Sequence, residues 1–176
     1  MRALPLLLLA GFLARPLVSQ SSPYTPRNEL PTRTQVLAVY FGQSDCAPCK
    51  EPALKAALHQ MKPLLLDQAT RTHRDFSTLG VALDWDLQAG LSVLEPLSEL
   101  DEVAVGANWM NAQAVRYIWQ DSTARAGIPQ VVLVERTVGV GGNGISVSPD
   151  RLLKRFVGAD VIEAWVAQGA PLPPSN

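Results

Sequence analysis

Two cysteines, Cys46 and Cys49, are the residues of this chain whose type and spacing most plainly allow chemistry, and they are its only cysteines among 176 residues. An apolar, strand-like run at residues 36–41 precedes them, and a helix-like run at residues 51–66 follows. The positive end of a helix dipole favours the thiolate of a cysteine at a helix N-terminus. A second thiol three residues on lies one turn away, close enough for a disulfide. We therefore predict a reversible dithiol/disulfide couple.

Two other interpretations of the cysteine pair stay open. A zinc site would need two further ligands, and His59 and His73, the only histidines, have a spacing that fits no zinc pattern. A structural disulfide is also possible, but one that closes a two-residue loop restrains the unfolded chain very little. Redox chemistry is favoured over both, and we expect neither a cofactor nor a metal.

The N-terminus has the pattern of an export signal. Arg2 supplies a positive charge, and the apolar run at residues 3–14 is too short for a membrane-spanning helix, which needs about 20 residues. We predict a cleaved signal peptide over residues 1–22 and export, with the periplasm as the expected compartment. An uncleaved N-terminus that anchors the chain in a membrane is the alternative.

Composition indicates one domain between two unstructured segments. Residues 23–33 are rich in Ser, Pro and Thr and are expected to form a disordered lead-in, and the Pro-rich residues 170–176 a flexible tail. Residues 34–169 are long enough for one domain with its own core. The net charge is −1 and the basic residues are scattered, so no nucleic-acid partner is expected.

The hydrophobic pattern predicts alternating strands and helices. Strands are expected at residues 36–41, 76–84, 102–105, 130–136 and within 151–157. Helices are expected at residues 47–66, 91–100, 109–120 and 161–168, with Asn108 and Asp160 as N-caps of the last two. Pro63 should kink or end the first helix, and residues 139–144 should form a hairpin loop. This order favours the α/β class, with a central mixed β-sheet flanked by helices on both faces.

Two motifs in this order resemble the thioredoxin superfamily. The segment Cys46-Ala47-Pro48-Cys49-Lys50 matches its redox motif, and Gly127-Ile128-Pro129 matches the loop that carries a cis-proline in that family. The interval from Asp84 to Pro129 leaves room for an extra helix and strand at residues 91–105. That insertion resembles the exported TlpA/ResA-like branch of thiol-disulfide oxidoreductases. The resemblance implies a thioredoxin-like three-layer fold.

The resemblance also implies roles for individual residues. Cys46 should attack a substrate disulfide and Cys49 should resolve the mixed disulfide. Ile128 and Pro129 should bind an extended substrate strand through their backbone. Pro48 has no N–H to offer a thiolate, and the motif holds no cation between its cysteines, which favours a reductant.

The implied function is that of an exported enzyme that reduces protein disulfides. Its partners would be cysteine-containing envelope proteins as substrates and a membrane or periplasmic electron donor, and a monomer is expected. A disulfide oxidant or isomerase is one alternative. A non-catalytic assembly or metallochaperone module on the same fold is another.

Two residues depart from the family pattern. Asp45 stands where most relatives have Trp, and a carboxylate beside Cys46 opposes thiolate formation, so it should raise the pKa of that thiol. Tyr40 stands where thioredoxins bury an acidic residue. Asp84 or Asp86, on or after the next strand, is then the candidate to accept a proton.

Overall fold

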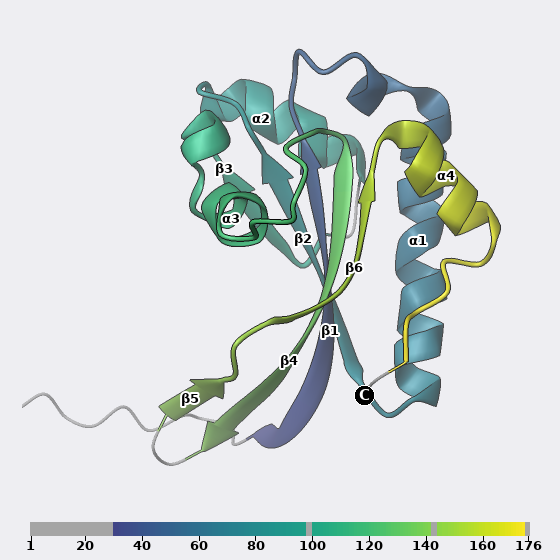
Figure 1. Ribbon diagram of the computed structural model, residues 1–176, viewed down its shortest axis with the longest axis vertical. Coiled ribbons are helices and arrows are strands. Elements are labelled where there is room, and N and C mark those ends of the chain that lie inside the picture. Colours follow the sequence, from purple (N-terminus) through teal and green to yellow (C-terminus); the bar gives the residue numbers. More distant parts are fainter. Residues whose placement is uncertain (1–29, 98–99, 142–143, 175–176) are drawn as a thin grey trace, which may run out of the picture.

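A computed structural model describes residues 30–97, 100–141 and 144–174 of the chain. Its centre is a six-stranded mixed sheet in the order β3-β2-β1-β4, with β5 and β6 both pairing with β4 (Figure 1). Strands β1, β2 and β3 are parallel, whereas β4 runs antiparallel to β1. The strands are β1 (Leu30–Gly42), β2 (Asp75–Ala82), β3 (Glu102–Val105), β4 (Gln130–Gly141), β5 (Gly144–Val147) and β6 (Arg151–Val157).

Helices cover both faces of this sheet. Helices α1 (Pro52–Arg71) and α4 (Ala159–Ala167) pack together on one face, and α3 (Ala112–Ala114) lies on the other (Figure 1). Helix α2 (Leu87–Leu94) packs beside β2 and β3 on the α1 face, because its Leu94 belongs to the same buried cluster as α1. The arrangement is a thioredoxin-like α/β fold, so the predicted fold class is confirmed.

Strand β1 separates the two halves of the core. Ala38 and Tyr40 belong to the buried cluster beneath α1 and α4. Leu37, Val39 and Phe41 belong to the cluster beneath α3 and the π-helical turn that follows it. Successive residues of a strand point to opposite faces, so an unbroken apolar run is what a strand buried on both faces requires.

Helix α1 continues past Pro63, so this proline does not end the helix, and the predicted end at residue 66 is also wrong. The helix runs to Arg71, and Pro63 is exposed while Met61 and Leu65 on either side are buried. A proline inside a helix costs about 3 kcal/mol. Burial of one apolar face of α1 against the sheet outweighs that cost, since tertiary packing supplies most helical stability in proteins.

The helices between β2 and β4 are shorter and more broken than predicted. Helix α2 begins at Leu87, where the Asp86 carboxylate accepts the Ala89 N–H at 2.7 Å, and it gives way at residue 95 to a 3₁₀ turn. The predicted helix at residues 109–120 is divided into a 3₁₀ turn, α3 and the π-helical turn η4 (Val115–Trp119). Asn111 causes the division, because its side chain accepts the Gln113 N–H at 2.9 Å and starts a new helix.

Strand β4 is longer than predicted, and β5 was not predicted. The ladder continues through Val138 and Val140, which pair with Val147 and Ile145 of β5. The glycines at residues 139–144 led to the prediction of a loop. In the structure, alternating apolar residues extend the pairing of β4 with β5 as far as Gly141 and Gly144. Together with the first residues of β1, this hairpin forms one end of the sheet, at the bottom of Figure 1.

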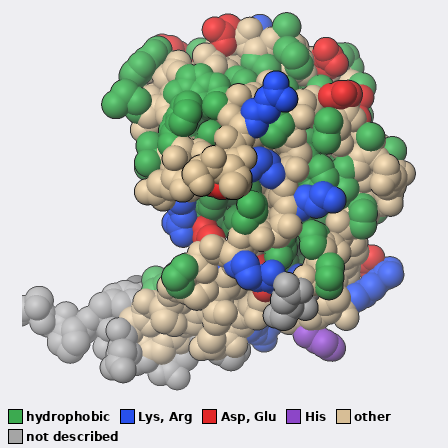
Figure 2. All heavy atoms as spheres, viewed as in Figure 1, with side chains coloured by type: hydrophobic (Ala, Val, Ile, Leu, Met, Phe, Trp, Pro, Cys, Tyr) green, Lys and Arg blue, Asp and Glu red, His purple; other side chains and the backbone are tan. Residues whose placement is uncertain are grey.

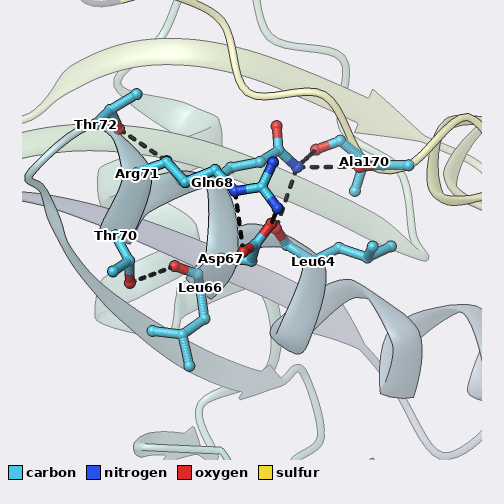
Figure 3. Close-up of polar contacts among 9 residues, drawn as sticks. Leu64, Leu66, Asp67, Gln68, Thr70, Arg71, Thr72 and Ala170 are labelled. Atoms are coloured by element: carbon cyan, nitrogen blue, oxygen red, sulfur yellow. Dashed lines mark hydrogen bonds and ion pairs between the residues drawn. The ribbon is translucent and has the colours of Figure 1, made fainter.

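The predicted flexible tail is in part fixed to α1. The Gln68 side chain donates to the carbonyls of Gly169 and Ala170, both at 3.0 Å; Figure 3 shows Gln68 directed toward Ala170. It also accepts the Leu172 N–H at 2.9 Å. Ala170 is fully buried. These bonds satisfy backbone groups beyond the end of α4, so the first residues of the tail belong to the domain.

The N-terminal boundary also differs from the predicted one. Strand β1 begins at Leu30, four residues before the expected start of the domain at residue 34. The predicted signal peptide at residues 1–22 lies outside the described residues. No helix within the described ranges is long and apolar enough to span a membrane.

Candidate active site

The two cysteines lie in the turn that follows β1, at the edge of the sheet where β1, β2 and β3 all end. They form a disulfide, as predicted, with a Cα–Cα distance of 5.3 Å. Cys49 is 4% exposed, whereas Cys46 is half-buried. Cys46 is thus the sulfur that a molecule approaching from solvent reaches first.

The local structure around the pair differs from the expected helix N-terminus. Pro48–Lys50 form a 3₁₀ turn, Glu51 is extended with ψ 132°, and α1 begins only at Pro52. Pro52 explains the break, because the ring of a proline disfavours helical geometry in the residue before it. The Cys49 N–H donates to the Cys46 sulfur at 3.2 Å. A local amide, rather than the first turn of α1, therefore polarises Cys46.

Asp84 joins this turn to the end of β2. Its buried carboxylate accepts the Ser44 N–H at 3.2 Å and the Ser44 hydroxyl. The Leu83 N–H donates to the Gly42 carbonyl at 2.9 Å, which carries the β1–β2 pairing past the end of the strands. Of the two acids predicted to accept a proton, Asp84 is therefore the one that is hydrogen-bonded to the redox turn, at Ser44, two residues before Cys46.

The other residues considered for proton transfer are placed differently. Asp86 is exposed, and its carboxylate caps α2. Burial raises the pKa of the Tyr40 hydroxyl, so that side chain is a neutral phenol. The hydroxyl lies beside Gly42, where a Cβ atom would come within 2.7 Å of it. Tyr40 therefore fills the space behind the turn but cannot supply the charge of a buried acid.

The loop before β4 lies at the same edge of the sheet. Gln130, the first residue of β4, pairs with Phe41, next to the end of β1. The Ile128–Pro129 peptide bond is cis, as predicted. The Pro129 carbonyl accepts the Gly158 N–H at 2.9 Å, and Ile128 is half-buried against the core cluster beneath α3. The register thus brings the predicted substrate-binding residues to the edge that holds the disulfide.

The remaining predicted residues lie on the surface of the turn. Asp45 and Pro48 are both exposed, directly beside Cys46 and Cys49 in the sequence. Across the described ranges, no group of three His, Cys, Asp or Glu residues is placed to hold a metal ion.

Sequence reasoning did not identify Ser44 or Asn108 as part of this site. Ser44 holds the Asp84 carboxylate, and the Asn108 N–H donates to the Asp84 carbonyl at 3.3 Å. A serine and an asparagine carry no distinctive signal in one sequence. The β1–β2 register pairs Gly42 with Ala82 and so places Ser44 opposite Asp84, but only the structure reveals that register.

No protein-family model matches the chain, and neither does any curated protein. Solved structures that are similar include a thiol-disulfide oxidoreductase from Bacteroides fragilis NCTC 9343, with 19% identity over 77% of this chain and 78% of that chain and a TM-score of 0.43. StoA from Bacillus subtilis has 15% identity over 74% and 81%, with a TM-score of 0.39. The thioredoxin domain of a thiol-disulfide oxidoreductase from Bacteroides vulgatus has 13% identity over 80% and 94%, with a TM-score of 0.43. Because these identities and scores are low, the chemistry of this chain rests on its own residues.

Proposed function

We propose that the chain is a thiol-disulfide oxidoreductase of the TlpA/ResA-like type, which reduces disulfides in exported proteins. The observation that carries the proposal is the pair Cys46–Cys49 at the open edge of a thioredoxin-like sheet, with one sulfur accessible and the other buried. A two-step exchange needs this difference in exposure. The attacking thiol must reach the substrate disulfide, whereas the resolving thiol needs to reach only the sulfur of the attacking cysteine.

The exchange starts from the dithiol form. The Cys46 thiolate attacks one sulfur of a substrate disulfide, and the other substrate sulfur leaves as a thiolate and takes up a proton. Cys49 then loses its proton and attacks the Cys46 sulfur, which releases the second substrate sulfur as a thiol. Two electrons pass to the substrate, and the Cys46–Cys49 disulfide remains. A dithiol electron donor of the cell envelope must restore the reduced form.

We assign to Asp84 the role of accepting the proton that the Cys49 thiol loses. Its carboxylate is buried and is tied to the redox turn through Ser44. Tyr40 is a neutral phenol and cannot accept that proton. The carboxylate of Asp86 already caps a helix, α2.

The direction proposed is reduction. Ala47 and Pro48 bring no charge between the cysteines, and Pro48 has no N–H to donate. The Cys46 sulfur thus has the Cys49 N–H as its donor within the turn. A couple whose thiolate is weakly stabilised is reducing, because a strong oxidant owes its potential to a stabilised reduced form. The loop at Ile128 and Pro129 supports binding of an extended protein substrate at the same edge.

Trapping tests the assignment of the two cysteines. A Cys49→Ser variant incubated with insulin as the disulfide substrate should accumulate a mixed disulfide through Cys46, which mass spectrometry of a tryptic digest identifies. A Cys46→Ser variant is the matched control and should trap none. Equal trapping by both variants would overturn the roles, and trapping by neither would overturn the proposed function.

A redox titration against glutathione tests the direction. We expect a reduction potential near that of thioredoxin, about −270 mV. A value near that of a strong oxidant, about −120 mV, would replace reduction with disulfide formation as the function.

A further inference from the structure

Arg155, in β6, is an arginine whose side chain is largely buried. Figure 2 shows Lys and Arg side chains at the surface around the region where Figure 1 places β6, and long basic side chains usually lie at the surface. Only 13% of the Arg155 side chain is exposed. Burial of a guanidinium is costly unless polar and charged partners satisfy its donors, so the partners of Arg155 show what its burial achieves.

The Arg155 guanidinium joins β6 to η4 and to the start of β4. Its Nη2 atom donates to the Tyr117 carbonyl at 2.8 Å, within η4, and to the Asp121 carboxylate at 2.9 Å, just after η4. Its Nη1 atom donates at 3.0 Å to the side-chain oxygen of Gln130, where β4 begins. Arg155 therefore contacts both ends of the segment between η4 and β4.

Gln130 extends this connection into the segment itself. Its side chain is fully buried, and its amide nitrogen donates to the Arg125 carbonyl at 3.2 Å. A guanidinium only donates and a carbonyl only accepts, so these two partners together fix the orientation of the Gln130 amide. Because Gln130 is bound on both sides, it couples the position of Arg155 to the backbone of Arg125.

The segment between η4 and β4, residues 121–129, holds the residues predicted to bind substrate, Ile128 and Pro129. We call this segment the substrate loop, and it contains no helix or strand. Arg155 holds its start directly and its middle through Gln130, and a backbone hydrogen bond holds its end at Pro129. A segment without regular structure depends on such contacts for its polar groups and its position.

We propose that Arg155 is a positioning residue that holds the substrate loop at the edge of the sheet where a protein disulfide must dock. The inference rests on the proposed function and adds the side chain on which the binding of protein substrates depends. An extended substrate strand pairs with backbone groups of the loop, so a displaced loop weakens its binding. A small disulfide needs only the accessible sulfur of Cys46, so its reaction is less sensitive to the loop.

Two substrates separate docking from the intrinsic reactivity of Cys46. Each prereduced protein is mixed with insulin or with 2-hydroxyethyl disulfide, and alkylation followed by mass spectrometry measures how fast the Cys46–Cys49 disulfide forms. Arg155→Lys keeps the charge but lacks the planar fork that reaches three acceptors. It should lower the ratio of the insulin rate to the small-disulfide rate about tenfold, because hydrogen bonds to a charged group are lost.

Arg151→Lys is the matched control in the same strand. The Arg151 side chain is 41% exposed and donates to the Glu135 carboxylate at 2.6 Å, at the start of β6. This variant should keep the wild-type ratio. Tryptic cleavage after Arg125, an exposed residue of the substrate loop, should be faster in Arg155→Lys than in Arg151→Lys, because a loosened loop is cleaved more readily.

Chemical rescue tests the guanidinium group itself. A cavity of about 490 Å³ that opens to solvent is lined by Tyr117, Asp121 and Arg155 among others, so a small ion can reach the place of a truncated side chain. In Arg155→Ala, millimolar guanidinium chloride should restore part of the insulin rate, because the ion can donate to the same acceptors. Sodium chloride at the same concentration should not.

Three results would overturn the inference. The first is a ratio of insulin rate to small-disulfide rate that stays at the wild-type value in Arg155→Lys. The second is an equal fall of that ratio in Arg151→Lys, which would indicate a general effect on the fold. The third is that guanidinium restores no more of the Arg155→Ala rate than sodium chloride does. Failure of the wild-type protein to react with either substrate would instead contradict the proposed function itself.

Discussion

The two ends of the sheet both expose large apolar side chains, but they are built differently. At the redox end, Trp85 and Leu87 after β2 and Met110 after β3 are exposed. At the hairpin end, Ile145 and Val147 of β5 are exposed. The redox end joins segments distant in sequence through side chains, as in the bond from Ser44 to Asp84, 40 residues away. The hairpin end is held mainly by the ladders of neighbouring strands. Exposed apolar side chains therefore occur at both ends of the sheet, but at the redox end they lie beside segments, distant in the sequence, that are joined by side-chain hydrogen bonds.

Strand direction explains this difference. Parallel strands β1, β2 and β3 all end at the redox edge, so the segments that follow them meet there and must satisfy their polar groups against one another. Strands β4 and β5 are antiparallel neighbours joined by a short connection. Their backbone groups pair within the hairpin, so no side chain from a remote segment is required.

The largest difference between the two ends, in stability and in disulfide exchange, should appear when a side-chain hydrogen bond is removed from each. Asp84→Ala leaves the Ser44 N–H and hydroxyl without their acceptor, which should lower the free energy of unfolding by about 2 kcal/mol and slow disulfide exchange. Ser148→Ala removes a hydroxyl that accepts the Thr137 N–H at 2.8 Å in an exposed setting at the hairpin end. It should cost less than about 1 kcal/mol and leave exchange unchanged. Urea unfolding of the reduced proteins and insulin reduction give the two measurements.

The Asp84→Asn variant sharpens this test. An asparagine keeps an oxygen that accepts the Ser44 N–H but carries no charge and accepts no proton. Stability should therefore recover in part while exchange stays slow near neutral pH, and the deficit in exchange should shrink at higher pH, where a thiol loses its proton to solvent. Full recovery of the exchange rate would mean that Asp84 only positions the turn and does not take the Cys49 proton.

A smaller difference should separate two glycines at the two ends. A Cβ at Gly42 would lie 2.7 Å from the Tyr40 hydroxyl, so Gly42→Ala must displace that buried ring and should cost about 1–2 kcal/mol. Gly141, in β4 at the hairpin end, has no atom within 4 Å of the same position. Gly141→Ala should cost nothing or stabilise slightly, because alanine restricts the unfolded chain. Equal destabilisation by the two substitutions in thermal unfolding would show that the Tyr40 contact does not matter.

The two ends also differ in how much of their structure could be predicted from the sequence. The cysteine pair and strand β6 follow from residue type, spacing and apolar pattern, whereas the cis-proline loop follows from the resemblance to the thioredoxin superfamily. The break at Glu51 was signalled by Pro52 but outweighed by the helical pattern around it. The Ser44–Asp84 bond depends on strand register, which one sequence does not reveal. Strand β5 was missed because its glycines resemble a loop and its pairing is a tertiary property.

The smallest expected effect concerns Asp45, which the sequence marked as unusual. The structure shows it exposed and also removes the opposing influence that a helix N-terminus at Cys46 would have exerted, since α1 begins only at Pro52. An exposed carboxylate acts through solvent, so its effect on the neighbouring thiol is well screened. Asp45→Asn should lower the Cys46 pKa by less than about one unit and make the couple slightly more oxidising.

Titration of the thiolate absorbance in the Cys49→Ser background measures this shift. Glu51→Gln is the matched control, because it removes an exposed acid that lies beyond the 3₁₀ turn rather than beside Cys46. It should change the Cys46 pKa less than Asp45→Asn does. An upward shift, or the same shift in both variants, would mean that the net charge of the redox end, and not Asp45 itself, sets the reactivity of Cys46.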